Sequence, residues 1–460
     1  MLDLDSPAAV QCDADSGRYA DPAPALPPQP KSVRETGLEQ QLIVELIAKA
    51  IFIAGKTHLP MLTTRLRLSI NVLREVLDFM VAEHLAEIAW RGESDIDVQY
   101  QLTAAGKQRA AAWLERCRYV GSAPVTLDAY RATIERQAAQ PPVTAEDLAA
   151  ELADDGLAPA VREQLGAALY SGRALLLYGP PGSGKTTLAR KLGRLQQGLV
   201  AVPYAVVVGR AIIQVHDAAL HLPPSPLQAM QEHQALERRS SDFRWALCQR
   251  PVVVLGAELN EDMLDLRPDA HSGCYQAPPH FRANNGLFII DDLGRQRLAA
   301  GALLNRYIEP LDRGLDQLSL QGGQQFTVPF DVTLVLATNL EPAALLDASA
   351  LRRLGYKIHI GALSEASYRQ LFRQQCRVAG IAYDDAALRY LVDELHRGAG
   401  QPLLACHPRE LLGRIADFAG FAGSAPRLTV ATLDQAWSSL FASCAPAVHE
   451  RGSLCPETIV

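Results

Sequence analysis

Apolar side chains recur at helical spacing through most of residues 38–118, and two short runs of alternating apolar and polar positions interrupt this pattern. The helical runs cover 38–55, 59–66, 69–81 and 103–118, and the alternating runs cover 86–92 and 97–103. Ser69 and Thr103 stand where a side chain caps a helix N-terminus. Three helices, a hairpin and a further helix in this order predict a small winged helix-turn-helix domain.

From residue 145 onwards, short and wholly apolar runs alternate with amphipathic helical patterns. The apolar runs are 174–178, 205–208, 252–255, 287–290 and 334–337. Strands that are apolar on both faces and separated by helices predict an α/β fold with a mostly parallel sheet covered on both sides. From about residue 363 only helical patterns remain, over 365–379, 385–395, 408–421 and 430–441, so a small helical domain is expected after the sheet.

These patterns divide the chain into a leader, a winged-helix domain, a linker, a sheet domain, a helical domain and a tail. The leader, residues 1–36, is rich in Pro, Ala and Asp and is expected to be disordered, because this composition cannot bury a core. The following segments are expected to cover 37–119, 120–145, 146–361, 362–443 and 444–460. Residues 198–280 form a long connection with a hairpin expected near Gly209, and the sequence assigns this insertion no role.

Composition changes this picture little. The chain has 460 residues, a net charge of −7 and 48% hydrophobic residues, which suits several domains and argues against a surface devoted to nucleic acid. Its 8 cysteines form no Cys-x-x-Cys pair and have no zinc-site spacing, as expected for reduced thiols in the cytoplasm. The sequence has no secretory signal and no apolar run long enough to span a bilayer, so no membrane partner is expected.

The strongest chemical signal is the phosphate loop, residues 179–187, which reads GPPGSGKTT between an apolar run and a helix. It matches the G-x-x-x-x-G-K-[ST] pattern, in which glycines let backbone N–H groups approach phosphate oxygens and the helix N-terminus favours an anion. Lys185 supplies a positive charge to the phosphates, and the Thr186 hydroxyl can ligate Mg²⁺. The predicted cofactors are ATP and Mg²⁺, held by Gly179, Pro180, Pro181, Gly182, Ser183, Gly184, Lys185, Thr186 and Thr187.

A second signal is GLFIIDDLGR, in which Asp291 and Asp292 follow the buried run 287–290. Ligands of parallel α/β sheets lie outside the carboxyl ends of the strands, where these carboxylates are expected. Asp291 is therefore the predicted second Mg²⁺ ligand beside Thr186. Asp292 is the predicted base that orients the attacking water.

From residue 146 to 442 the order of these motifs resembles the AAA+ ATPase superfamily. In LVLATNLEP, Asn339 matches the sensor 1 position, and in CHPRELLGRI, Arg409 matches sensor 2, with Arg414 as the weaker choice. DASALRRLGYKIHI is similar to the helix that presents an arginine finger to a neighbouring subunit, which selects Arg353, with Arg352 as second choice. The resemblance implies Asp292, Asn339 and Arg353 as catalytic residues and Arg409 as a nucleotide contact.

Two stretches resemble the MoxR-like and magnesium-chelatase-like branch: FRANNGLFIIDD, and the hairpin QLSLQGGQQFTVPFD that turns at Gly322-Gly323. The whole arrangement is also similar to bacterial AAA family ATPases with an N-terminal winged helix. One departure concerns Asp292, because most relatives carry Glu there. Since Asp is one methylene shorter, the attacking water is held less firmly, which favours slow hydrolysis.

The resemblance implies a ring-forming homo-oligomer, a hexamer by analogy, that hydrolyses ATP to remodel a protein partner. The alternative is an ATP-gated transcription regulator that binds DNA through the 69–81 helix. DNA is not favoured, because that helix offers Arg74 against Glu75 and Asp78, whereas duplex binding needs several cations aimed at phosphates. A small-molecule kinase is disfavoured, because it would have no use for the helical lid or for Arg353 and Arg409.

Overall fold

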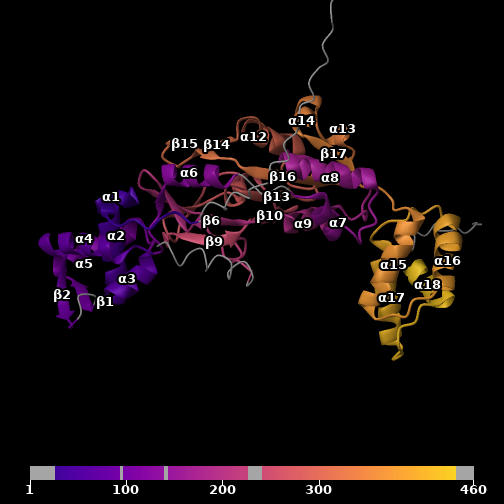
Figure 1. Ribbon diagram of the computed structural model, residues 1–460, viewed down its shortest axis with the longest axis horizontal. Helices are drawn as coiled ribbons and strands as arrows, with labels where there is room; N and C mark the ends of the chain where they lie inside the picture. Colours follow the sequence, from indigo (N-terminus) through magenta and orange to yellow (C-terminus); the bar gives the residue numbers. More distant parts are fainter. Residues whose placement is uncertain (1–25, 94–96, 139–142, 226–240, 442–460) are drawn as a thin grey trace, which may run out of the picture.

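The computed structural model describes residues 26–93, 97–138, 143–225 and 241–441. Three parts follow one another along its long axis: N-terminal helices, a central α/β region and a C-terminal group of helices (Figure 1). Within the described residues, no helix combines the length and apolar character that a membrane crossing requires.

The N-terminal part contains the helices and the hairpin that the sequence predicts. Ser69 and Thr103 accept hydrogen bonds from backbone N–H groups at the starts of α4 and α5. A short strand, β1, joins the hairpin to give a sheet of order β1-β3-β2; at three residues it is too short to show an alternating pattern. The elements are α2 Gln40–Ala54, β1 Lys56–His58, α3 Leu59–Leu66, α4 Ile70–Ala82, β2 Ala86–Arg91, β3 Val98–Leu102 and α5 Ala104–Arg116.

Two segments expected to be irregular carry structure. Residues 26–36, assigned to the leader, include helix α1 (Val33–Thr36) and a β-bridge from Pro28 to Ser241. The linker includes β4 (Val125–Thr126) and helix α6 (Leu127–Gln137), whose Tyr130 is buried. Val125 of β4 pairs with Val206 of β7, and Pro28 forms a bridge with Ser241, so local composition gives no sign of these pairings.

The central sheet confirms the predicted α/β fold. Its strands are all parallel in the order β10-β13-β16-β5-β17. Alternate residues of the strands face two hydrophobic clusters, one shared with α8 (Pro159–Ser171) and α9 (Lys185–Arg194), the other with α12 (Ala300–Arg313) and α14 (Ala348–Arg353). The strands are β5 Leu175–Tyr178, β10 Val252–Leu255, β13 Gly286–Ile290, β16 Val332–Thr338 and β17 Tyr356–His359.

One strand assignment was wrong. The run 205–208 forms β7 (Ala205–Val208) of a different sheet, and the fifth strand of the central sheet is β17, which the sequence analysis placed at the end of a helix. β17 lies at the edge of the sheet and only its Ile358 is buried, so it lacks the apolar run that marks the other four.

The different sheet, called the insertion sheet here, has the order β11-β12-β8-β7-β4 and lies mostly within the 198–280 insertion. Its β7 and β8 form the hairpin expected at Gly209. Ala205, Ile212 and Cys274 of this sheet belong to the same hydrophobic cluster as the N-terminal helices. The N-terminal part is therefore packed onto the central region through a shared core.

The other strands of the insertion sheet are β8 Ala211–Gln214, β11 Arg267–Asp269 and β12 Cys274–Gln276. Two further pairs form two-stranded sheets: β6 Leu199–Pro203 with β9 Trp245–Gln249, and β14 Leu315–Ser319 with β15 Gln325–Pro329.

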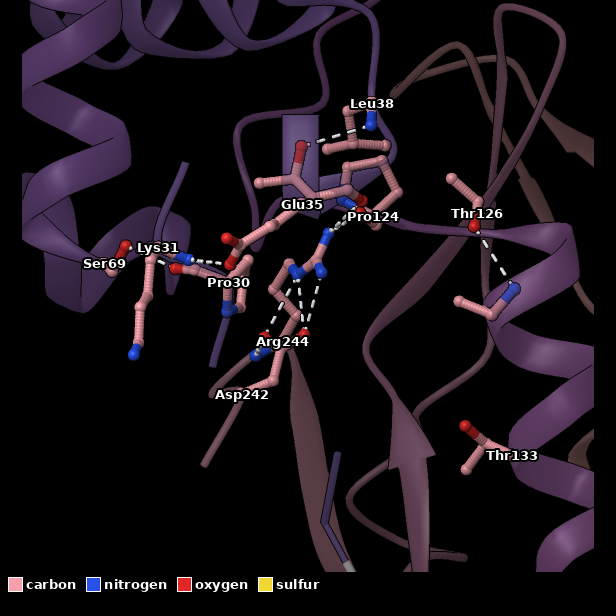
Figure 2. Close-up of polar contacts among 12 residues, drawn as sticks. Pro30, Lys31, Glu35, Leu38, Ser69, Pro124, Thr126, Thr133, Asp242 and Arg244 are labelled. Carbon is pink, nitrogen blue, oxygen red and sulfur yellow. Dashed lines mark hydrogen bonds and ion pairs between the residues drawn. The ribbon is translucent and has the colours of Figure 1, made fainter. Parts of the chain in front are cut away.

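A buried ion pair reinforces this union (Figure 2). The Arg244 guanidinium donates to both carboxylate oxygens of Asp242, with its shortest contact at 2.8 Å, and the two side chains are 5% and 4% exposed. The same guanidinium donates to the carbonyl oxygens of Thr36 and Pro124, each at 3.2 Å. Asp242 also donates its backbone N–H to the Pro27 carbonyl. Arg244 thus joins both ends of the N-terminal part to the central region.

The C-terminal part, called the lid, is helical as predicted. It contains α15 Glu365–Ala379, α16 Asp385–Tyr390, the π-helical turn Leu391–His396, α17 His407–Phe421 and α18 Val430–Leu440. Tyr368 and Phe372 of α15 are buried in its own hydrophobic cluster.

We expect Arg244→Met to lower the free energy of unfolding by about 3–5 kcal/mol, because Asp242 would stay buried without a counter-charge. Trp245 is 3% exposed and next to the pair, so its fluorescence during urea unfolding reports the loss. The matched control is Arg313→Met, which removes a 3.0 Å pair with Glu309 whose side chains are 72% and 58% exposed. That control should cost less than about 1 kcal/mol, and equal losses would contradict the assigned role of Arg244.

Candidate functional site

The phosphate loop has a backbone that glycine alone accommodates at its first position. Gly179 has a φ of 142°, and a Cβ placed there would lie 2.3 Å from the carbonyl oxygen of Ile360, just after β17. Gly184 has a φ of 96° and stands at the N-cap of α9. These conformations turn the loop from the end of β5 into the start of α9, where helix N–H groups are available to an anion.

Lys185 lies inside this loop. Its Nζ donates to the carbonyl oxygens of Gly179 at 3.0 Å and Pro180 at 2.8 Å. Burial lowers the pKa of Lys185, and the negative charges of Asp292 and Asp291 act in the opposite direction. The ammonium group is therefore held against the loop and faces the two carboxylates.

A chain of hydrogen bonds joins the ends of three elements beside the loop. The Thr186 hydroxyl on α9 donates to Asp291 Oδ1 at 3.0 Å. The Asp292 backbone N–H donates to the same oxygen at 3.0 Å, and Asn339 Nδ2, just after β16, donates to Asp292 Oδ1 at 3.1 Å. Because β16 lies between β13 and β5, Asn339 stands beside both the carboxylates and the phosphate loop.

Asp292 has a left-handed backbone with a φ of 50°. Asp and Asn tolerate this region better than most residues other than glycine. The residue that follows is fixed to β16, because Leu293 N donates to the Ala337 carbonyl and the Thr338 hydroxyl donates to the Leu293 carbonyl, both at 2.7 Å. The turn after β13 is thereby tied to β16.

The other end of β13 depends on a residue that the sequence analysis did not select. Asn285 is fully buried, has a φ of 61° and donates from Nδ2 to the Ile134 carbonyl at 3.1 Å. Its Oδ1 accepts from Gln137 Nε2 at 3.2 Å, and Arg250 donates to its carbonyl at 2.7 Å. An Asn-Asn-Gly sequence directly ahead of a buried strand is the signal that could have found it.

A cavity of about 560 Å³ lies between the phosphate loop and the lid. The lid touches the loop directly, because the Cys406 backbone N–H donates to the Gly182 carbonyl at 3.0 Å. A second contact joins Gln374 of α15 to Asp154, with an N–O distance of 3.1 Å. The cavity lining includes Pro181, Gly182, Ser183, Gly184, Lys185, Thr186, Thr187, Asp291, Asp292, Asn339 and Arg409.

The structure thus brings most predicted site residues together, and leaves some outside. Gly179 and Pro180 contact Lys185 through their carbonyl oxygens instead of lining the cavity. Arg353 lies elsewhere, at the end of α14, where its Nε donates to Asp312 at 3.0 Å. Arg414 donates to the Glu410 carbonyl and does not line the cavity.

Several lining residues were missed. Asp154 and Asp155 lie in the turn after α7 (Ala145–Glu151), and Asp155 forms a 2.8 Å ion pair with Lys191 of α9. Gln374 and Gln375 reach the cavity from the lid. No motif marks these positions, because they meet only when the lid is folded onto the central region.

The order of the strands decides the fold. The phosphate loop follows β5, Asn339 follows the neighbouring β16, and the carboxylates follow β13 beyond it, with Arg409 facing them from the lid. This parallel arrangement agrees with the resemblance of the motifs to the AAA+ ATPases, and it adds a sheet order that the sequence alone did not predict.

Comparisons with known proteins find one family model and several similar solved structures. A family model described as a domain of unknown function (DUF8689) matches residues 364–439, within the lid. No curated protein matches the chain. Similar solved structures include the RuvB Holliday junction branch migration motor of Thermotoga maritima, 18% identical over 61% of this chain and 68% of that chain, with a TM-score of 0.33. Another is NtrX of Brucella abortus in complex with ADP, 16% identical over 72% of this chain and 65% of that chain, with a TM-score of 0.36.

The site offers ligands suited to Mg²⁺. Thr186 and Asp291 present a hydroxyl and a carboxylate oxygen, the hard oxygen donors that this ion prefers. Among the described residues, no group of three or more His, Cys, Asp or Glu side chains could hold a metal. These two residues would supply protein ligands to a bound ion, in keeping with magnesium sites completed by phosphate and water.

We expect Gly179→Ala to weaken ATP binding by about tenfold or more, because the added methyl group meets the Ile360 carbonyl and the φ of 142° strains any side chain. Titration with a fluorescent ATP analogue measures the change. The control is Gly301→Ala in α12, where a Cβ would meet no described atom within 4 Å. An unchanged affinity in Gly179→Ala would show that the loop does not bind the phosphates.

Proposed function

We propose that this protein is an ATPase that assembles into a ring and uses hydrolysis to remodel a protein partner in the cytoplasm. The observation that carries the ATPase assignment is the hydrogen-bonded series Thr186–Asp291–Asp292–Asn339, which lies beside Lys185 in one cavity. A glycine-rich loop that only connected a strand to a helix would not explain why these polar side chains lie beside it.

Each residue has a distinct proposed role in phosphoryl transfer to water. Lys185 neutralises phosphate charge, and Thr186 and Asp291 would hold Mg²⁺, which would supply positive charge to offset that of the phosphates. Asp292 orients the attacking water and accepts its proton, while Asn339 holds the Asp292 carboxylate in place. Catalysis then consists of positioning and charge stabilisation.

The geometry of Asp292 supports the expectation of slow turnover. One of its carboxylate oxygens already accepts from Asn339, which leaves Oδ2 for water. Its left-handed backbone also offers a physical reason for Asp at this position, because a left-handed conformation suits Asp better than longer side chains. The Asp292 side chain that suits this conformation extends less far towards the attacking water than Glu would.

Arg353 is the proposed arginine finger, and it would act on the site of a neighbouring subunit because it lies outside the cavity of its own chain. Its ion pair with Asp312 has side chains 32% and 50% exposed, so releasing it costs less than about 1 kcal/mol. Arg352, the second choice, is exposed and has no ion pair with any described residue. This proposal includes the ring, with six subunits by resemblance.

The partner is proposed to be a protein contacted by the β14–β15 hairpin, whose two strands pair as expected around Gly322-Gly323. DNA binding through α4 is not favoured by the structure. Recognition helices contact bases with their N-terminal residues, whereas the first turns of α4 are hydrogen-bonded to residues 30 and 33. There the Ser69 hydroxyl donates to the Pro30 carbonyl at 2.8 Å, and Val33 N donates to Glu75 Oε2 at 2.9 Å.

We expect Asp292→Asn to bind ATP with little change and to lose at least about a hundredfold in turnover, the usual contribution of a general base. Phosphate release under ATP saturation measures turnover, and analogue titration measures binding. Lys185→Ala is the contrasting variant, because it should lose binding itself. Normal turnover in Asp292→Asn would disprove the proposed base.

Arg353→Ala should keep ATP binding and lose about 10³-fold in turnover. Mixing it with Lys185→Ala subunits tests action between subunits, because each inactive chain supplies what its neighbour lacks. Recovery of phosphate release on mixing is the expected result. If Arg353→Ala is fully active, the finger is not Arg353, and Arg352→Ala tested in the same mixture decides whether Arg352 takes its place.

A further inference from the structure

The four-residue helix α11 (Pro279–Arg282) leads directly into the foot of the acidic strand β13. Arg282, its last residue, is bound to the insertion sheet and its connections. Its NH1 pairs with Asp217 Oδ2 at 3.1 Å, and its NH2 donates to Gln276 Oε1 at 2.7 Å. Its carbonyl oxygen accepts from His221 Nε2 at 2.9 Å, and His221 is 2% exposed.

From His221 a continuous series of ring contacts leads to the N-terminal part. The rings of His221 and His216 are stacked with centroids 5.3 Å apart, and His216 lies 4.8 Å from the ring of Tyr204. The guanidinium of Arg67 lies over the Tyr204 ring, 4.1 Å from its centroid. Arg67 caps the C-terminus of α3 and belongs to the turn between α3 and α4.

On the other side of Arg282, the chain reaches the carboxylates through a rigid segment. Asn284 donates to the Tyr130 hydroxyl at 2.7 Å, and the buried Asn285 is fixed by α6. β13 then pairs with β10 and β16 along its whole length and ends at Asp291. A displacement of α11 has few ways to be absorbed before it reaches the catalytic carboxylates.

The same helix also contacts the β14–β15 hairpin. His280 donates from Nε2 to Asp316 Oδ2 at 2.7 Å, and both side chains are 1% exposed. The Tyr307 hydroxyl of α12 contacts His280 Nδ1 at 3.3 Å. α11 therefore lies where the N-terminal part, the hairpin and the acidic strand meet.

We propose that Arg67, Tyr204, His216 and His221 are positioning residues that couple the N-terminal part, through α11, to Asp291 and Asp292. The series is contiguous from the α3–α4 turn to the foot of β13, which is the physical requirement for transmitting a change between two distant sites. This inference rests on the proposed ATPase function. Occupation of the N-terminal part by a partner then alters turnover more than it alters ATP affinity.

Hydrogen exchange on the full chain, with and without Mg²⁺ and ADP, tests the coupling. In the wild type, nucleotide should protect residues 179–187 and also change exchange at residues 62–69. Tyr204→Leu should keep the first effect and lose the second, because the stacked series is broken. Tyr204→Phe retains the ring and should behave as the wild type. Arg67→Asn offers a second break, since Asn suits the left-handed backbone at that position, where φ is 56°.

Turnover provides an independent readout. Tyr204→Leu should lower kcat about fivefold. Its KM for ATP should stay within about twofold of the wild-type value, and its unfolding midpoint should match that of the wild type. The matched control is Tyr383→Leu, which removes the cation–π contact of Arg373 with Tyr383 in the lid, at 5.0 Å. This control should leave kcat and both exchange responses unchanged.

The outcomes separate the inference from the function on which it rests. Protection of 179–187 without any response at 62–69 in the wild type overturns the coupling and leaves the ATPase proposal intact. A response at 62–69 that persists in both Tyr204→Leu and Arg67→Asn also overturns it. No protection of 179–187 would remove the ATPase proposal itself.

Discussion

The acidic strand β13 is bounded at both ends by residues with left-handed backbones, Asn285 and Asp292, and the site depends on this constraint. Neither residue is glycine, so each conformation carries some strain that its surroundings must hold. Asn285 is held by buried hydrogen bonds to α6 and Arg250, and Asp292 by the turn tied to β16. Because both ends are fixed, the two carboxylates have a defined position relative to Thr186 and Asn339.

Much of the site follows from local sequence. The phosphate loop, the acidic strand and the caps at Ser69 and Thr103 are recognisable because their chemistry is complete within a few residues. What escaped prediction depends on long-range contacts. β17 has one buried side chain and belongs to the sheet because it pairs with β5. Asp154 lies at the cavity because the lid packs beside it, where Gln374 donates to its carboxylate. The roles assigned to Asp292, Asn339, Arg353 and Arg409 stay predictions, because geometry shows where side chains lie and not what they catalyse.

The 198–280 insertion, to which the sequence assigned no role, provides the surface on which the N-terminal helices pack. A domain on a flexible linker would move independently of the central region. Here the expected linker is replaced by a strand of the insertion sheet and by α6, and Arg244 bonds to both sides of the N-terminal part. The N-terminal part is therefore an extension of the central region.

The hydrogen bond from Cys406 to the Gly182 carbonyl links the first turn of lid helix α17 to the phosphate loop itself. Gly182 has no side chain, and a Cβ there would lie 2.5 Å from the Cys406 sulfur. The lid can rest on the loop only because of that missing atom. Under the proposed ATPase function, opening of the lid breaks this backbone bond, so nucleotide exchange would depend in part on the stability of a contact that contains no charged group.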